Sequence, residues 1–309
     1  MVFFLKIIDF HVHPLSAIKS NDLLAEMKKA NVEKAVILSM ELEPDLLKTK
    51  KLKNDIAKHF EYTTFFDLDP IYAGMDYVLH MGNTPMDYVA DLVKANKNDF
   101  IGFGSVHVGY KSRRFIKKKL QIIKQLQEEL GFKGIKILPT LQFYNPETSS
   151  GLIEVFKFAE KRDLIVTCHT GCDPGPWEIP LLSVNGNPLL LKPLLNKYKT
   201  KVILAHMGSY SSRIPGLWFE EAAKVVHDYK NVYGDLSAVP YLVTQPEMVE
   251  TMRRFNIFNK ILYGSDYPVT SAGAAIGMST IVNIVKNSEL LEDYEKENIF
   301  YYNAESLLK

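Results

Sequence analysis

Short apolar runs alternate with segments of helical periodicity along this chain of 309 residues, and the alternation narrows the choice of fold sharply. The runs are typical of strands, and the segments between them carry apolar residues three or four positions apart, as amphipathic helices do. Eight strands are predicted, at residues 3–8, 34–40, 100–108, 134–139, 164–169, 201–206, 232–237 and 260–266. Strands that alternate with helices form a parallel sheet, and eight units close a (β/α)8 TIM barrel. We predict this α/β barrel, with a doubly wound open sheet as the alternative.

Residues 41–84 interrupt the alternation between the second strand and the next helix. They contain a short basic helix and then an aromatic, acidic stretch. A long excursion at the C-terminal side of a barrel strand suits an active-site lid or an oligomer contact, and we favour the lid. No interdomain linker is visible, so we expect one domain over residues 1–309 with an insertion after strand 2.

The composition argues against several classes of function. The formal net charge is +1, so no global field attracts nucleic acid or an anionic membrane. The chain has 2 cysteines, too few for a disulfide framework, which suits a reducing compartment. No stretch reaches the roughly 20 apolar residues of a membrane span, and the start lacks the basic region and cleavage site of a signal peptide. We expect a cytoplasmic protein.

The first predicted strand leads into the hexapeptide Asp9-Phe10-His11-Val12-His13-Pro14. Side chains alternate along a strand, so His11 and His13 project to the same side. Two imidazoles placed in this way bind a divalent metal ion if other ligands converge on them. Asp9 has the same parity and either orients a ligand or forms a structural ion pair.

Further polar residues occur where barrel enzymes carry their catalytic groups, at the C-terminal ends of strands. His169, His206 and Asp266 end the fifth, sixth and eighth predicted strands. Any one of these histidines alone is explained as a core residue with satisfied hydrogen bonds. Together with His11 and His13 they predict a metal site.

The chain resembles the amidohydrolase superfamily, in particular the branch called amidohydrolase 2 or aminocarboxymuconate-semialdehyde decarboxylase-like. The motifs that carry the resemblance are DFHVHP, GFKGIKILPTLQFYNP, CHTG, AHMG, YGSDYP and NIFYYNAESLL. The resemblance implies that His11, His13, His169 and Asp266 bind one divalent ion, usually zinc, with His206 beside it. Three imidazoles and a carboxylate suit Zn²⁺ and leave room for a water.

A metal-bound water has a lowered pKa and attacks a polarised carbonyl. Asp266 is expected to move the proton of that water, and His206 to polarise the substrate oxygen. The leading hypothesis is a metal-dependent hydrolase that cleaves a C–N or C–O bond of a small amide, lactone or ester. The alternative is a metal-dependent non-oxidative decarboxylase, a lyase that acts on a small aromatic or unsaturated acid. A nuclease and a non-catalytic protein fit less well.

Other residues have weaker assignments. Lys136 ends the fourth strand and can point inward by parity, either as a packing or ion-pair residue or, as the resemblance to other amidohydrolases implies, as a carboxylated bridge between two metals. Cys168 faces away from the pocket if His169 faces into it. Arg213, Trp177 and His107 are candidate substrate-binding residues, Arg213 because guanidinium pairs with carboxylate. The resemblance also favours a homodimer.

Overall fold

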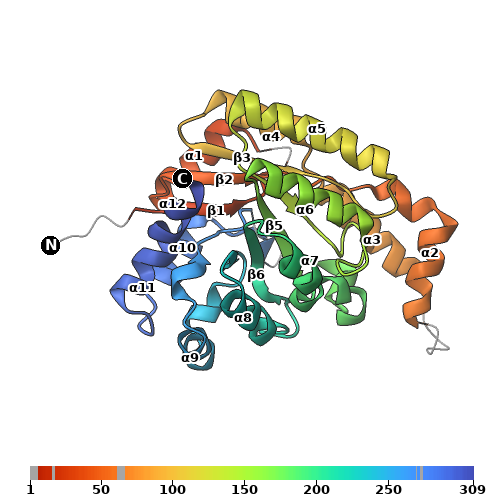
Figure 1. Ribbon diagram of the computed structural model, residues 1–309. Helices are drawn as coiled ribbons and strands as arrows, with labels where there is room; N and C mark the ends of the chain where they lie inside the picture. The colour runs from red at the N-terminus through yellow and green to blue at the C-terminus, as the bar shows by residue number, and fades with distance from the viewer. Residues whose placement is uncertain (1–5, 16–17, 61–66, 269, 272–273) are drawn as a thin grey trace.

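The computed structural model describes residues 6–15, 18–60, 67–268, 270–271 and 274–309, and it contains an eight-stranded parallel sheet with strands in chain order, β1 to β8 (Figure 1). The strands are β1 (Ile8–Val12), β2 (Lys34–Leu38), β3 (Phe100–Ser105), β4 (Gly134–Ile137), β5 (Ile165–Gly171), β6 (Val202–Tyr210), β7 (Val232–Asp235) and β8 (Ile261–Leu262). The start of the first predicted strand, residues 3–5, lies outside the described residues. The unbroken strand order confirms the TIM barrel and excludes the open sheet, in which the order would reverse.

Backbone hydrogen bonds join β1 to the chain that follows β8. The amide of Phe10 donates to the carbonyl of Tyr263 at 2.9 Å, and the amide of His13 donates to that of Tyr267 at 3.0 Å. In the other direction, the amide of Asp266 donates to the carbonyl of His11 at 2.8 Å. These bonds bring the first and last strands together at the seam of the barrel.

Helices surround the strands (Figure 1). They are α1 (Ser20–Ala30), α2 (Lys50–Ala57), α3 (Asp69–Gly82), α4 (Met86–Ala95), α5 (Arg113–Leu130), α6 (Ser150–Arg162), α7 (Lys192–Lys197), α8 (Phe219–Asp228), α9 (Pro246–Arg254), α10 (Met278–Lys286), α11 (Asp293–Glu297) and α12 (Asn303–Leu308). In the part of the chain that the structure describes, no helix combines the length and the apolar character needed to cross a bilayer.

Helix α5 illustrates how the sequence sets these elements. Ile116, Leu120 and Ile123 recur at helical spacing and are the buried residues of its inner face. The Ser112 side chain accepts a hydrogen bond from the Phe115 amide at the N-terminus, at 3.2 Å. Gly131 ends the helix with φ of 70°, a left-handed conformation that glycine adopts without steric cost.

One buried apolar cluster contains inward-facing residues of the strands and is covered by α12. Phe10 and Phe103 meet edge to face in it, with ring centroids 5.9 Å apart. The pairing of β1 with β2 shifts register between Asp9 and Val12. Phe10 therefore joins the apolar cluster, while His11 and His13 still reach the polar end of the barrel. A β-bulge of this kind re-aims side chains near functional sites.

Between β2 and α4 lie a 3-10 helix at Pro44–Lys48, helix α2, a second 3-10 turn at Lys58–Phe60, and helix α3. Their buried residues form a separate cluster with the loops that follow β4 and β5; it includes Leu52, Ile56, Met75, Leu138 and Trp177. This segment thus packs at the C-terminal end of the barrel. Residues 61–66 of the predicted insertion lie outside the described residues, and a lid role stays a prediction.

The contact between Gly102 on β3 and Phe132 after α5 gives a test of the packing behind the sheet. A Cβ at position 102 would lie 2.3 Å from the Phe132 ring. We expect Gly102→Ala to lower the free energy of unfolding by about 1–3 kcal/mol, since the ring must move. In denaturant titrations, Gly102→Ala combined with Phe132→Leu should cost less than the sum of the single substitutions. Strict additivity would contradict the contact.

Candidate metal centre

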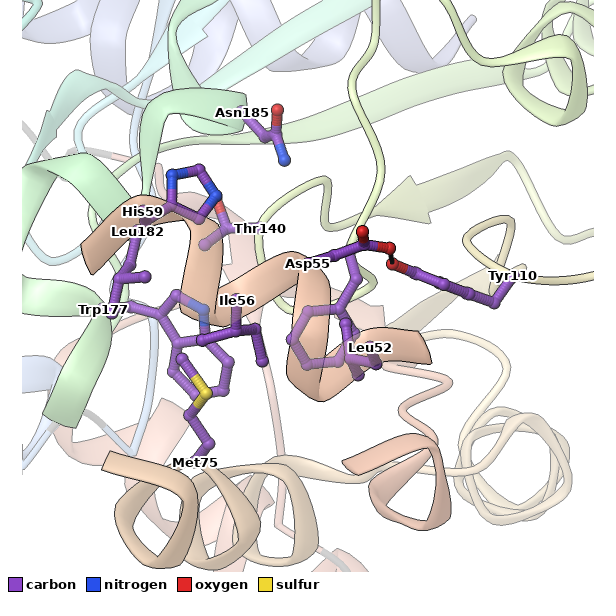
Figure 2. A pocket seen from close by; sticks show the side chains of 11 residues that line it. Leu52, Asp55, Ile56, His59, Met75, Tyr110, Thr140, Trp177, Leu182 and Asn185 are labelled. Carbon is purple, nitrogen blue, oxygen red and sulfur yellow. Dashed lines mark hydrogen bonds between the residues drawn. The ribbon is translucent and has the colours of Figure 1, made fainter. Parts of the chain in front are cut away.

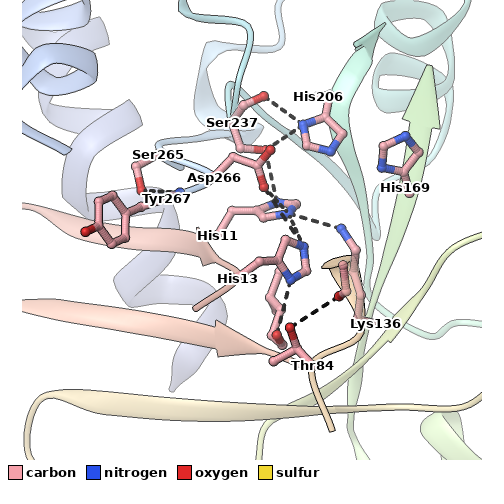
Figure 3. A network of polar contacts seen from close by, with 12 residues as sticks. His11, His13, Thr84, Lys136, His169, His206, Ser237, Ser265, Asp266 and Tyr267 are labelled. Atoms are coloured by element: carbon pink, nitrogen blue, oxygen red, sulfur yellow. Dashed lines mark hydrogen bonds and ion pairs between the residues drawn. The ribbon is translucent and has the colours of Figure 1, made fainter. Parts of the chain in front are cut away.

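The five predicted residues come together at the C-terminal end of the barrel (Figure 3). His11 lies on β1, His13 just after it, His169 on β5, His206 on β6, and Asp266 beyond β8. The Nε2 atoms of His11 and His13 are 3.1 Å apart, and Oδ1 of Asp266 lies 3.4 Å and 4.0 Å from them. The His206 ring centroid is 4.9 Å from that of His11 and 4.7 Å from that of His169.

Hydrogen bonds orient three of the imidazoles through Nδ1. His11 Nδ1 lies 2.8 Å from Oδ2 of Asp235, and His13 Nδ1 lies 3.2 Å from the carbonyl of Leu38. His206 Nδ1 lies 2.7 Å from the carbonyl of Ser237. Each acceptor holds the proton on Nδ1, so each ring presents the lone pair of Nε2. Metal-binding histidines are commonly held in this way.

His169 is held through its other nitrogen. Its Nε2 lies 2.6 Å from the carbonyl of Cys172 and 3.2 Å from Oδ1 of Asp173, which leaves Nδ1 as the lone-pair atom. Among the described residues, the compact three-residue set of possible metal ligands is His11, His206 and Asp266, whose ligand atoms all lie within 4.8 Å of one another. His206 therefore lies as close to His11 and Asp266 as a further ligand would, although the sequence analysis placed it beside the ion.

Burial keeps the imidazoles neutral, which is the form that binds metals. Desolvation lowers the pKa of His11, His13 and His206 well below the usual value, and lowers that of His169 to about 3. Desolvation also raises the pKa of Asp266 to about 8.

The donor set fits a cation. Unprotonated nitrogens of His11 and His13 face each other at 3.1 Å, next to the Asp266 carboxyl group. Lone pairs at this separation repel unless a positive charge lies near them. In the described structure the amine of Lys136 meets this need in part as a hydrogen-bond donor, with Nζ at 3.1 Å from His11 Nε2. A divalent ion bound by imidazole and carboxylate would do so more fully.

Backbone strain marks two of these residues. His206 has φ of 62° and Asp266 has φ of 56°, and residues with side chains rarely adopt positive φ. The observed strands also have other ends than those predicted at 201–206 and 260–266. Strand β6 continues past His206 to Tyr210, and β8 ends at Leu262, before Asp266. Strain of this kind concentrates at functional sites, where the surrounding structure holds it in place.

The sequence analysis missed Asp235, Ser237 and Asp173. Asp235 is fully buried at the end of β7 and contacts His11. The same pattern that identified Asp266, a carboxylate at the end of an apolar strand, would have found it. Ser237 links the two neighbouring rings, with Oγ at 3.0 Å from His11 Nδ1 and 2.9 Å from His206 Nδ1. Asp173 lies in an irregular segment, where no sequence periodicity predicts its contact with His169.

Three secondary expectations have clear outcomes. Lys136 points inward, as its parity predicts, and contacts His11. Cys168 is buried in the outer apolar cluster, away from the site. Asp9 holds the backbone next to the site: its carboxyl group accepts hydrogen bonds from the amide of His11 at 3.1 Å and from the amide of Ser265 at 2.9 Å, and it has no ion pair among the described residues.

A cleft of about 500 Å³ opens above the centre, a size that suits a small molecule. Its floor contains His13, His169, His206 and Asp266. Apolar side chains from α3 and from the loops after β2 and β4 form a wall: Met40, Val78, Met81, Leu138 and Leu141. The acidic residues Asp173 and Glu178 line the part supplied by the segment after β5.

The three predicted substrate-binding residues lie elsewhere. Arg213 is exposed, although its neighbour Ser212 lines the cleft. Trp177 lines a separate cavity of about 120 Å³ between α2, α3 and the segment after β5 (Figure 2). His107 is buried, and neither ring nitrogen has a hydrogen-bond partner in the described structure. None of the three is among the described residues that line the cleft, and their substrate roles stay predictions.

Solved structures share this fold at low sequence identity. An uncharacterised TIM-barrel protein from Bordetella bronchiseptica is 17% identical, with a TM-score of 0.68 and 98% of each chain covered. A probable 2-pyrone-4,6-dicarboxylic acid hydrolase from Acinetobacter baumannii, solved with citric acid, is 14% identical, with a TM-score of 0.60 and coverage of 98% of this chain and 99% of its own.

A 5-carboxyvanillate decarboxylase from Novosphingobium aromaticivorans, solved with manganese, is 17% identical, with a TM-score of 0.57 and coverage of 93% of this chain and 80% of its own. No curated protein matches the chain. A protein-family model described as amidohydrolase matches residues 8–309, nearly the whole sequence. The match confirms the resemblance seen in the motifs: the chain belongs to the amidohydrolase 2 family.

Proposed function

We propose that this enzyme is a metal-dependent hydrolase that cleaves a C–N or C–O bond of a small amide, lactone or ester. The observation that carries the proposal is the Asp266 carboxyl group, 3.4 Å from His11 Nε2 and on the floor of a cleft of small-molecule size. A carboxylate beside a metal centre is well placed to accept a proton from water and return it to a leaving group.

His11, His13, His169 and Asp266 would hold one divalent ion, and zinc suits three imidazoles and a carboxylate. When bound, such an ion lowers the pKa of water and polarises a carbonyl oxygen. His206 presents an unprotonated Nε2, because Nδ1 donates to Ser237. It therefore serves as a further ligand or accepts a proton, and it donates to a substrate oxygen only once protonated.

The decarboxylase alternative uses the same residues, and several solved neighbours bear that activity in their names, 2,6-dihydroxybenzoate and 5-carboxyvanillate decarboxylases among them. Decarboxylation needs a substrate carboxylate to be held. The residue predicted for that task, Arg213, is exposed, and no arginine or lysine is among the described residues that line the cleft. This observation supports the hydrolase. Zinc as the ion, a homodimer and a cytoplasmic location belong to the proposal as well.

The metal content tests the centre directly. After purification with zinc or manganese supplied, we expect about one ion per chain, because a single set of imidazoles and one carboxylate converge. His11→Ala should lose the ion, whereas His227→Ala, at an exposed position on α8, should keep it. Elemental analysis provides the measurement. A ratio near two would instead indicate a second ion bridged by a carboxylated Lys136, and no bound ion would overturn the proposal.

Asp266→Asn tests the proton transfer. On a panel of lactones, amides and aromatic acids, we expect hydrolysis by the wild type and a fall in kcat of about 10²–10⁴-fold in the variant, because asparagine cannot accept the proton. Product release is followed by chromatography alongside CO₂ detection. Release of CO₂ from an aromatic acid without any hydrolysis would establish the decarboxylase instead.

Asp235→Asn tests how the centre is oriented. Asp235 accepts the proton of His11 Nδ1 at 2.8 Å, so the substitution removes the charge that holds that tautomer. We expect metal affinity to fall about 10–100-fold, measured by competition with a chelator. Asp228→Asn on the surface of α8 is the matched control. Unchanged affinity in Asp235→Asn would refute the orienting role.

A further inference from the structure

We propose that the substrate presents a neutral or cationic hydrogen-bond donor to Glu178, in the part of the cleft that the segment after β5 supplies, and that a carboxylate there is rejected. The inference rests on the proposed function and deepens it, since it defines the class of substrate that the centre receives.

Acidic side chains are the charged groups that line the cleft. Among the described lining residues, Asp173, Glu178 and Asp266 are acidic, and none is lysine or arginine. The cations near the cleft do not offset them in this part of it. Lys136 contacts His11 at the metal centre, and the side chain of Arg213 is exposed. A substrate anion that approached Glu178 would meet the negative charge of its carboxylate with no lysine or arginine beside it among the described lining residues.

Glu178 is itself placed to bind a ligand. It ends a 3-10 helix at Gly175–Glu178, after β5, and is only 9% exposed. Its carboxylate accepts hydrogen bonds from the Ser211 hydroxyl at 3.0 Å and from the Ser212 amide at 3.0 and 3.1 Å. These bonds fix its direction but bring no positive charge, and no ion pair of Glu178 occurs in the described structure. A carboxylate offers about four lone-pair positions, so it can accept a further donor.

Asp173 supplies an independent observation. It is 2% exposed, lines the same cleft, and its Oδ1 contacts His169. Its Oδ2 is buried and has no hydrogen-bond partner in the described structure. Buried polar atoms are costly when unpaired, so Oδ2 of Asp173 indicates that the ligand brings a polar group to this part of the cleft.

Apolar side chains that line the cleft define the body of the substrate. Val78 and Met81 of α3 line it, and Tyr77 and Met81 remain 67% and 51% exposed. Leu138 and Leu141 add to the apolar lining of the same cleft. The cleft therefore favours a molecule with a scissile carbonyl at one end, an apolar body, and an amine, amide N–H or hydroxyl group at the other. Dicarboxylates, the class named for the Acinetobacter neighbour, are disfavoured.

Hydroxamates of matched length test this selectivity, because the hydroxamate group chelates a metal and so fixes which end of the probe faces Glu178. The end of each probe remote from the hydroxamate carries an ammonium, a methyl or a carboxylate group. Each of these three groups is tested on a short and on a long methylene spacer. Calorimetry on the zinc-loaded enzyme should give about tenfold tighter binding of the best ammonium probe than of its carboxylate counterpart. The methyl probe should lie between them.

Glu178→Gln should remove most of this preference while the methyl probe binds as before, since glutamine keeps an acceptor for the Ser212 amide. Glu289→Gln, which removes the same charge from an exposed position, should leave the order unchanged. Equal or tighter binding of the carboxylate probe by the wild type would overturn the inference, even if the Glu178 variant fails to fold. Failure of every hydroxamate to bind the metal-supplied protein would instead count against the metal centre.

Discussion

The seam between the first strand and the chain after the last one is the constraint on which the site depends. His11 and His13 lie on one side of this seam and Asp266 lies on the other, more than two hundred residues later in the chain. Three backbone hydrogen bonds cross it between residues 10–13 and residues 263–267, and a further hydrogen bond runs from the Ser265 amide to the buried Asp9 carboxyl group. The same bonds that close the barrel therefore set the spacing between the imidazoles and the carboxylate.

A second layer of hydrogen bonds decides what each imidazole can do. Asp235, the Leu38 carbonyl and the Ser237 carbonyl hold the Nδ1 protons of His11, His13 and His206. Burial opposes protonation of the rings, so their free nitrogens stay available as ligands or bases. The positive φ angles at His206 and Asp266 show that the backbone is strained to aim these side chains.

The segments after β2 and β5 shape the approach to the centre. Helix α3 supplies the apolar wall, and the segment from Cys172 to Glu178 supplies the acidic end. On the proposed function, these two parts would meet different parts of a substrate. The buried floor would hold the metal and the scissile bond, and the walls would select the rest of the molecule. A conserved type of centre can thus serve different substrates when only the walls change.

Much of this could be predicted from the amino-acid sequence, because the relevant signals are local. Alternating apolar runs and helical periodicity define the barrel, and His11, His13, His169, His206 and Asp266 stand out as polar residues at apolar strand ends. Only the tertiary structure decided the orientation of each ring, the roles of Asp235 and Asp173, and the absence of Arg213, Trp177 and His107 from the described cleft lining. Those features depend on contacts between residues far apart in the chain and on loop conformation, neither of which has a periodic signal. The class of chemistry can thus be predicted from the residue types at the strand ends. The choice of substrate depends on the charge and shape of the assembled cleft, which only the tertiary structure defines.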